Sequence, residues 1–325
     1  MRSILFIVNP IAGSSPKQEI EGIARKMINP EELLCRFAYT EYAGHAYTLA
    51  AQAVKEECQT VVAVGGDGTI NEVARALVHS QTELGIIPCG SGNGLARHLM
   101  LPKEAKRALQ IILNGESSLV DYGIINGHHF FCTCGMGFDA LVSKKFAQAG
   151  RRGFLTYIDS VVKEFKSYVP ENYRIEADGV EVINEKAFLL SFANASQYGN
   201  NAYIAPHALI SDGLLDMILM EPFDFIEASQ ISLELFNKTL NKHTKIKSLQ
   251  GKEFTVYRAK EGLIHIDGDA LQTSARVDIK IVPKGLRVII NPSADRSHRH
   301  PNFLQHATSN LFRSFNTLRS RLHKK

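Results

Sequence analysis

The sequence has no tryptophan and no apolar run long enough to cross a bilayer. Its longest such runs, residues 4–8 and 187–190, fall far short of the roughly 20 residues that a membrane helix needs. The run at residues 4–8 follows Met1-Arg2, but Asn9-Pro10 ends it without a signal-peptide cleavage site. We therefore expect a chain that does not span a membrane.

Cysteine is also scarce. The five cysteines are an odd number and show neither a disulfide framework nor the paired spacing of a metal site. Cys132 and Cys134, two apart on a predicted strand, are expected in the core rather than as ligands. This usage predicts reduced thiols and a cytoplasmic setting.

The net charge of +4 is concentrated at the C-terminal end, because residues 291–325 hold seven Lys or Arg against one Asp. The rest of the chain is slightly acidic, so it does not resemble a nucleic-acid binder. Apolar residues recur at steps of three and four within residues 301–325, which predicts a basic amphipathic helix. Three placements stay open for this helix: on a membrane surface, on the body of the protein, or against a second copy in a homodimer.

The chain is organised around residues 60–78. A β-branched run at residues 60–64 stops at Gly-Gly-Asp-Gly-Thr, residues 65–69, which predicts a parallel strand, a tight turn and a helix beginning at Thr69. Thr69 and Glu72 have the spacing of a capping box. Glycine amides beside a helix N-terminus favour a phosphate. The Asp67 carboxylate would repel that phosphate unless a metal bridges the two or the carboxylate orients a nucleophile. The turn therefore indicates magnesium-nucleotide chemistry. The alternative is a tight turn with a hydrogen-bonding Asp.

Similar strand-loop-helix units surround this one. Strands are predicted at residues 2–8, 34–39 and 84–87, with helices from Pro16 to about 27, from Gly44 to about 58, and from about Gly94. Four such units predict a parallel sheet whose loops gather at its carboxyl edge. The chain has neither a P-loop sequence nor Gly-x-Gly-x-x-Gly after the first strand, which excludes those two nucleotide sites.

The pattern changes at about residue 119. Asn126-Gly127 predicts a hairpin, and strands dominate after residue 173. Helices are expected at about residues 138–149, 154–168 and 224–240. A mostly β second domain follows.

The glycine-rich loops resemble those of lipid kinases. Gly-Gly-Asp-Gly-Thr is similar to the signature of diacylglycerol, sphingosine and NAD kinases. Asn-Pro-Ile-Ala-Gly at residues 9–13 and Pro-Cys-Gly-Ser-Gly-Asn at residues 88–93 resemble two further lipid-kinase loops, the second of which NAD kinases lack. The resemblance covers about residues 4–283. It implies an α/β nucleotide-binding domain at residues 1–120, with a parallel sheet of the NAD kinase and diacylglycerol kinase type. Residues 121–285 would form a mostly β, sandwich-like domain for the lipid substrate. The chain would return to the first domain at about residues 286–300.

The resemblance also implies roles for individual residues. Asp269 stands where the family has the last residue of Asp-Gly-Glu, the general base, and is one methylene shorter; taken alone, Asp-Gly-Asp is a hairpin turn. Asp67 is expected as a metal or network carboxylate, with Asp121 linked to it. Thr40, taken alone, fits a routine helix cap. The implied nucleotide residues are Asn9, Pro10, Gly13, Thr40, Gly65, Gly66, Asp67, Gly68, Thr69, Asn71, Glu72, Gly90, Ser91 and Asn93, and the implied magnesium ligands are Leu209, Asp212 and Leu214.

The implied activity is transfer of the γ-phosphate of Mg-ATP to a lipid hydroxyl at a membrane surface, with diacylglycerol as the first choice. Three alternatives stay open. Residues 90–96 look more like sphingosine and ceramide kinases, which favours a sphingoid-base or ceramide substrate. The others are an NAD kinase-like enzyme and, because of Asp269, a catalytically silent nucleotide- or lipid-binding protein. The lipid substrate implies a cytoplasmic protein that associates peripherally with membranes.

Overall fold

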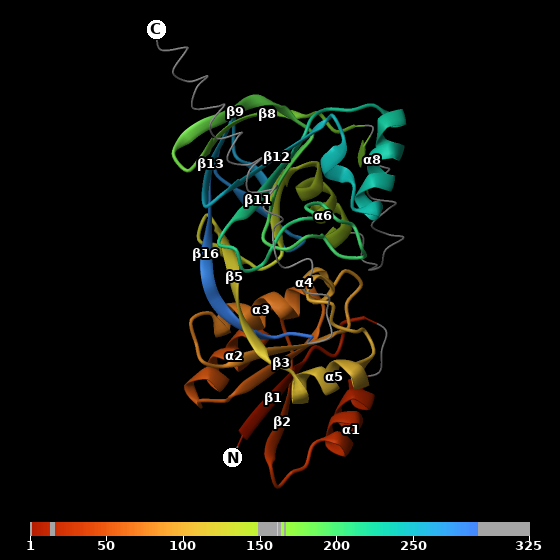
Figure 1. Ribbon diagram of the computed structural model, residues 1–325, viewed down its shortest axis with the longest axis vertical. Helices are drawn as coiled ribbons and strands as arrows, with labels where there is room; N and C mark the ends of the chain where they lie inside the picture. The colour runs from red at the N-terminus through yellow and green to blue at the C-terminus, as the bar shows by residue number, and fades with distance from the viewer. Residues whose placement is uncertain (1, 14–16, 149–160, 162–163, 166, 292–325) are drawn as a thin grey trace.

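The computed structural model describes residues 2–13, 17–148, 161, 164–165 and 167–291. Two domains are stacked along the long axis of the molecule, with the N-terminal domain at the bottom of Figure 1. The predicted helices at 154–168 and 301–325 lie wholly or largely outside the described residues. Within the described part, no helix is long and apolar enough to cross a membrane.

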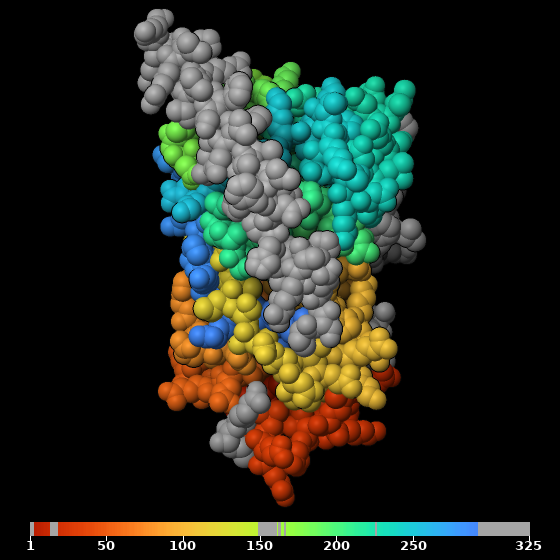
Figure 2. Space-filling view, in the orientation of Figure 1, coloured from red at the N-terminus to blue at the C-terminus, as the bar shows by residue number. Residues whose placement is uncertain are grey.

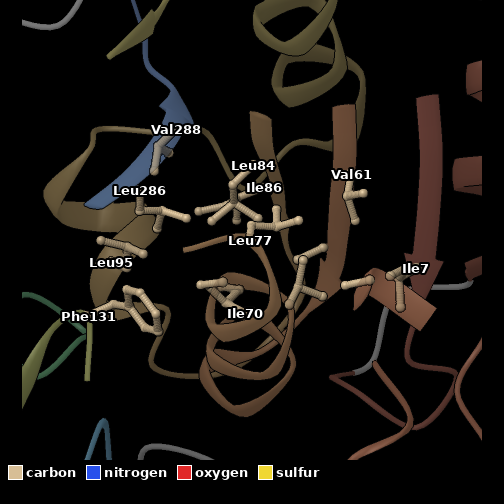
Figure 3. Packing of buried hydrophobic residues seen from close by; sticks show 14 of the residues in the cluster. Ile7, Val61, Ile70, Leu77, Leu84, Ile86, Leu95, Phe131, Leu286 and Val288 are labelled. Carbon is tan, nitrogen blue, oxygen red and sulfur yellow. The ribbon is translucent and has the colours of Figure 1, made fainter. Parts of the chain in front are cut away.

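The N-terminal domain is a parallel sheet covered by helices. Strands β1, β2, β3 and β4 pair in the order β2-β1-β3-β4. Successive strand residues face opposite sides, so Val61 packs in one apolar cluster and Val62 in the other. Figure 3 shows the first cluster, between the sheet and α3. The elements are β1 (Arg2–Val8), α1 (Lys17–Met27), β2 (Leu33–Tyr39), α2 (His45–Lys55), β3 (Thr60–Gly65), α3 (Asp67–Leu77), β4 (Glu83–Pro88), α4 (Gly94–His98) and α5 (Ala105–Asn114).

One helix prediction needs correction here. The single helix expected from about Gly94 is two helices, because α4 ends at His98 and α5 begins at Ala105. Pro102 lies between them and cannot donate a helical hydrogen bond.

The C-terminal domain is a two-sheet sandwich. One sheet has the order β12-β11-β10-β7-β14-β15, and the apolar core between the two sheets includes Phe192 and Phe254, whose ring centroids are 5.0 Å apart. Cys134 is buried in this core. The elements are β5 (Ser117–Ile125), β6 (His128–Phe130), β7 (Thr133–Gly137), α6 (Phe138–Gln148), β8 (Glu171–Ala177), β9 (Val180–Ala187), β10 (Leu189–Ala193), β11 (Leu215–Met220), α8 (Phe225–Asn237), η1 (Leu240–Lys242), β12 (Ile246–Gly251), β13 (Glu253–Arg258), β14 (Gly262–Ile266), β15 (Asp269–Thr273) and β16 (Arg276–Ile289).

Strand β16 joins the two domains. It pairs with β13 and β5 in antiparallel fashion and then reaches β4, where Val288 lies opposite Leu84 in parallel register. The same sheet therefore runs through both domains, and the yellow and blue atoms of β5 and β16 lie between them in Figure 2. The observed α/β domain and β-sandwich confirm the predicted fold class.

Candidate active site

Three loops meet at the carboxyl edge of the parallel sheet: the first loop (residues 9–13), the second loop (65–69) and the third loop (88–93). The side-chain amide of Asn9 donates to the Thr69 hydroxyl at 3.0 Å, which ties the first loop to the second. The amide of Cys89 donates to the Gly65 carbonyl at 2.8 Å, which ties the third loop to the second. The parallel strands place the loops, and these hydrogen bonds hold them together.

Glycine is required where the loops touch. A Cβ on Gly13, whose φ is +63°, would lie 1.8 Å from the Cys89 carbonyl oxygen. A Cβ on Gly90 would lie 2.6 Å from the Gly66 Cα. The glycines that suggested a phosphate cradle therefore also let the loops pack backbone against backbone.

Asp67 holds the third loop against α3. Its Oδ2 accepts the amide of Asn93 at 2.8 Å, and its Oδ1 accepts the amide of Gly94 at 2.7 Å. Asn93 is in the left-handed region, and its side chain closes the loop by accepting the Gly90 amide at 3.0 Å. Burial, with a smaller contribution from the charge of nearby Asp267, raises the pKa of Asp67 to about 6 against the opposing effect of these amides. Asp67 therefore takes part in a hydrogen-bond network that joins the second and third loops, and its role toward a metal stays a prediction.

The predicted capping box is wrong. Helix α3 begins at Asp67, two residues before the predicted start, and its N-cap is Gly66 without a side-chain cap. The Thr69 hydroxyl instead accepts the Asn9 amide of the first loop. A tertiary partner has replaced the local one.

Glu72 and Thr40 also differ from their local predictions. The Glu72 carboxylate accepts the amides of Gly44 at 2.8 Å and Ala46 at 3.1 Å, so it supports the start of α2. Because Gly44 is the N-cap of α2, Thr40 is not a helix cap. Its amide donates to the Val8 carbonyl at 2.9 Å, which places Thr40 beside the first loop.

Asp267, which begins the Asp-Gly-Asp motif and had no predicted role of its own, joins the two domains. It occupies the β14–β15 turn with φ +48°, followed by Gly268 with φ +94°. Its carboxylate accepts the Asn71 side-chain amide at 2.8 Å and three backbone amides, those of Phe131, Cys132 and Thr133. Asn71 lies on α3, so this turn of the second domain is hydrogen-bonded directly to the nucleotide domain. Burial raises the pKa of Asp267, while the donors oppose the rise.

Asp269 faces the second loop from the other domain. It is the exposed first residue of β15, and its Oδ2 lies 3.7 Å from the position that a Cβ on Gly68 would occupy. A carboxylate therefore lies next to the first turn of α3, where helix geometry favours phosphate.

Asp121 is connected to a different part of the second domain. Its two oxygens accept the amides of Gly213 and Lys284, each at 2.7 Å. Its hydrogen bonds therefore lead to the 209–214 turn rather than directly to Asp67. Burial raises the pKa of Asp121, and these two amides act against the rise.

The 209–214 turn carries the predicted magnesium ligands. The Leu214 amide donates to Asp212 Oδ1 at 3.0 Å, which fixes the carboxylate within the turn. Burial, together with the charge of Asp212, raises the pKa of nearby Asp216 to about 7. Among the described residues no cluster of three acidic, His or Cys side chains could hold a metal. Two neighbouring carboxylates and the backbone carbonyls of Leu209 and Leu214 nevertheless suit a hard cation such as Mg²⁺.

Glycine-rich loops on a parallel sheet, faced by a carboxylate from a β-sandwich, place a phosphate site next to a group that can accept a proton, which are two of the parts that phosphoryl transfer requires. Residues 3–125 match the model of the diacylglycerol kinase catalytic domain, and residues 132–290 match that of the YegS C-terminal NAD kinase beta sandwich-like domain. A diacylglycerol kinase of Mycobacterium tuberculosis (strain ATCC 25618 / H37Rv) is 30% identical over 256 residues, which cover 76% of this chain and 82% of that protein. The chain belongs to the diacylglycerol kinase catalytic-domain family, and it is a kinase.

A further relative and two solved structures are also similar to this chain. A probable lipid kinase YegS-like of Yersinia pestis (strain Pestoides F) is 26% identical over 300 residues, covering 90% of this chain and 98% of that protein. The crystal structure of a putative diacylglycerol kinase from Bacillus anthracis shares the fold with a TM-score of 0.73 at 22% identity, covering 90% of this chain and 98% of that one. A yeast NADH kinase shares it more distantly, with a TM-score of 0.53 at 11% identity, covering 94% of this chain and 88% of that one.

Proposed function

We propose that the protein is an ATP-dependent lipid kinase that phosphorylates the free hydroxyl of diacylglycerol to give phosphatidic acid. The position of Asp269 beside Gly68 carries the proposal, because it puts a carboxylate of the second domain next to the nucleotide loops. The family membership supports a diacylglycerol substrate.

The phosphates of ATP are assigned to the start of α3. The first hydrogen bond of this helix runs from the Ile70 amide to the Gly66 carbonyl, so the amides of Gly68 and Thr69 precede the helical ladder. Amides in this position attract phosphate oxygens. The other predicted nucleotide residues at this edge, including the exposed Pro10 and Ser91, remain predictions.

Asp269 is assigned as the general base. An exposed carboxylate beside the phosphate site can accept the proton of the lipid hydroxyl as that oxygen attacks the γ-phosphorus, while the bond from the γ-phosphorus to the bridging oxygen breaks and ADP leaves. Asp67 is less suited to this step, because its two oxygens already accept the amides of Asn93 and Gly94.

A magnesium ion is assigned to the 209–214 turn. Asp212 would supply a side-chain oxygen and Leu209 and Leu214 would supply carbonyl oxygens, with Asp216 adding negative charge nearby. When bound, the cation would offset negative charge that this turn concentrates. Asp121, through the Gly213 amide, would keep the turn in place.

The direct test is transfer of labelled γ-phosphate from Mg-ATP to diacylglycerol, a sphingoid base, ceramide and NAD, each presented separately and the lipids in mixed micelles. We expect label on diacylglycerol. Label on a sphingoid base or ceramide would favour the alternative suggested by residues 90–96, and label on NAD would contradict a lipid substrate. Binding of ATP with no labelled product would favour a catalytically silent protein.

Peripheral membrane association is part of the proposal, since the substrate resides in a bilayer. Liposome flotation of the full chain, compared with a chain that ends at Asn291, tests the contribution of the basic tail. Equal flotation of the two chains would contradict a membrane role for the tail.

A further inference from the structure

A buried carboxylate outside the nucleotide loops connects three elements of the second domain. Asp139, the second residue of α6, is only 6% exposed. Its Oδ1 accepts the amide of Ala140 at 2.7 Å. Its Oδ2 accepts the hydroxyl of Tyr198 and faces the Nε2 of His265, both at 3.0 Å. Because a carboxylate only accepts hydrogen bonds, we assign the Nε2 proton to this contact. The donors satisfy the buried carboxylate and fix its orientation.

A glycine in the neighbouring strand leaves room for the contact between Asp139 and His265. Gly135 on β7 lies opposite His265 on β14. A Cβ on Gly135 would lie 2.9 Å from both Asp139 Oδ2 and His265 Nε2. A side chain at this position would push the pair apart, so the Asp139–His265 contact depends on a glycine in the neighbouring strand.

His265 links the Asp139 carboxylate to the β14–β15 turn, here called the catalytic turn, which contains Asp267 and leads to Asp269. It is 2% exposed and lies on β14, two residues before Asp267 and four before Asp269. The Asp267 amide donates to the Thr133 carbonyl at 2.9 Å, so the turn is also attached to β7. Holding His265 against α6 therefore limits how far the β14–β15 turn can move.

Tyr198 links the same carboxylate to the nucleotide domain. The chain just after Tyr198 contacts the third loop, where the Asn200 amide donates to the Gly92 carbonyl at 3.2 Å. Arg97 on α4 donates to that carbonyl at 2.9 Å and to the Asn201 side chain at 3.0 Å. The third loop and the catalytic turn are thus both hydrogen-bonded, through short paths, to Asp139.

We propose that Asp139 is a positioning residue for phosphoryl transfer. Through His265 and Tyr198 it sets the β14–β15 turn at a fixed distance from the third loop, and so sets Asp269 against the bound phosphates. This inference rests on the proposed function, in which Asp269 is the base. Displacement of a reacting group by about 1 Å can cost on the order of 100-fold in rate, so a residue that fixes this distance affects catalysis without touching the substrate.

Asp139→Asn tests the proposal with little change of shape. The new amide has one accepting oxygen in place of two, so it cannot accept the Ala140 amide together with the Tyr198 hydroxyl and the His265 N–H. We therefore expect kcat to fall about 10- to 100-fold while KM for Mg-ATP stays within about twofold. Tyr198→Phe removes one of the two links and should give a smaller loss. Val142→Ala is the matched control, because Val142 is fully buried on the same helix. It should leave kcat within about twofold.

Hydrogen exchange gives a second readout that does not require turnover. The amides of residues 131–133 donate to Asp267. We expect them to exchange about tenfold faster in Asp139→Asn than in the unmodified protein, and at an unchanged rate in Val142→Ala. If the unmodified protein phosphorylates no acceptor, the proposed function fails, and the exchange comparison still decides whether Asp139 holds the turn.

Three results would overturn the inference: an unchanged kcat in Asp139→Asn, an equal loss of kcat in Val142→Ala, or unchanged exchange of these amides in Asp139→Asn. If Asp139→Asn does not fold, Tyr198→Phe carries the same comparison. An unchanged kcat and unchanged exchange in Tyr198→Phe would then contradict the proposed role of the cluster.

Discussion

Asp216 offers a quantitative test of the cation site. Burial and the charge of Asp212 raise its pKa to about 7, whereas an unfolded Asp titrates near 4. The folded protein therefore binds more protons than the unfolded chain between about pH 4 and 7, and its stability falls as the pH rises through this window. A difference of three pKa units lowers the free energy of unfolding by about 4 kcal/mol at pH 8, relative to a folded protein in which Asp216 stays protonated. At pH 5 the loss is already roughly 1–2 kcal/mol.

The perturbation is Asp216→Asn, which keeps an oxygen for the Gln250 side-chain amide, a donor at 3.2 Å, and cannot become charged. In EDTA we expect this variant to be more stable than the unmodified protein, and the difference in free energy of unfolding to be about 2–3 kcal/mol larger at pH 8 than at pH 5. Urea denaturation followed by circular dichroism at both pH values measures it. Glu261→Gln, at an exposed position of the same domain, is the control and should show no such difference.

Magnesium adds a second arm to this experiment. A cation at the 209–214 turn would stabilise the charged form of Asp216, so Mg²⁺ should stabilise the unmodified protein at pH 8 and reduce the advantage of Asp216→Asn. If the free energy of unfolding of Asp216→Asn exceeds that of the unmodified protein by the same amount at pH 5 and pH 8 in EDTA, then burial and repulsion by Asp212 do not raise the pKa of Asp216. If Mg²⁺ leaves the stability difference between Asp216→Asn and the unmodified protein at pH 8 unchanged, no cation binds beside Asp216.

Three other substitutions test the site. Gly13→Ala should destabilise the protein by about 2–4 kcal/mol in urea denaturation, because the new methyl would meet the Cys89 carbonyl at a position with positive φ; stability within about 0.5 kcal/mol would show that the loops are not so closely packed. Asn71→Ala removes the donor that joins α3 to Asp267, and we expect kcat to fall about tenfold with no change in the fold by circular dichroism; full activity would mean that the backbone amides alone hold the turn. Asp269→Ala should lower kcat about 100-fold or more and leave the affinity for ATP, measured by calorimetry, nearly unchanged; retained activity would exclude Asp269 as the base.

The strands and loops of the N-terminal domain were predictable because their signals are local. The run at residues 60–64 is apolar and β-branched and ends at two glycines, which is enough to predict a buried parallel strand and a tight turn, and β3 is that strand. The start of the following helix was not predictable. Thr69 and Glu72 have the residue types of a capping box, yet the structure gives each a partner from another loop.

The sequence by itself determined the fold class and the family, because glycine loops at the ends of apolar strands are contiguous patterns that a single reading detects. Only the tertiary structure decided how the carboxylates are used. Asn71 meets Asp267 across 196 positions of sequence, and His265 meets Asp139 across 126. Both contacts are made across long separations in the chain. A local pattern shows that a carboxylate is present, but its charge state and its role depend on the burial and the donors that distant segments bring to it.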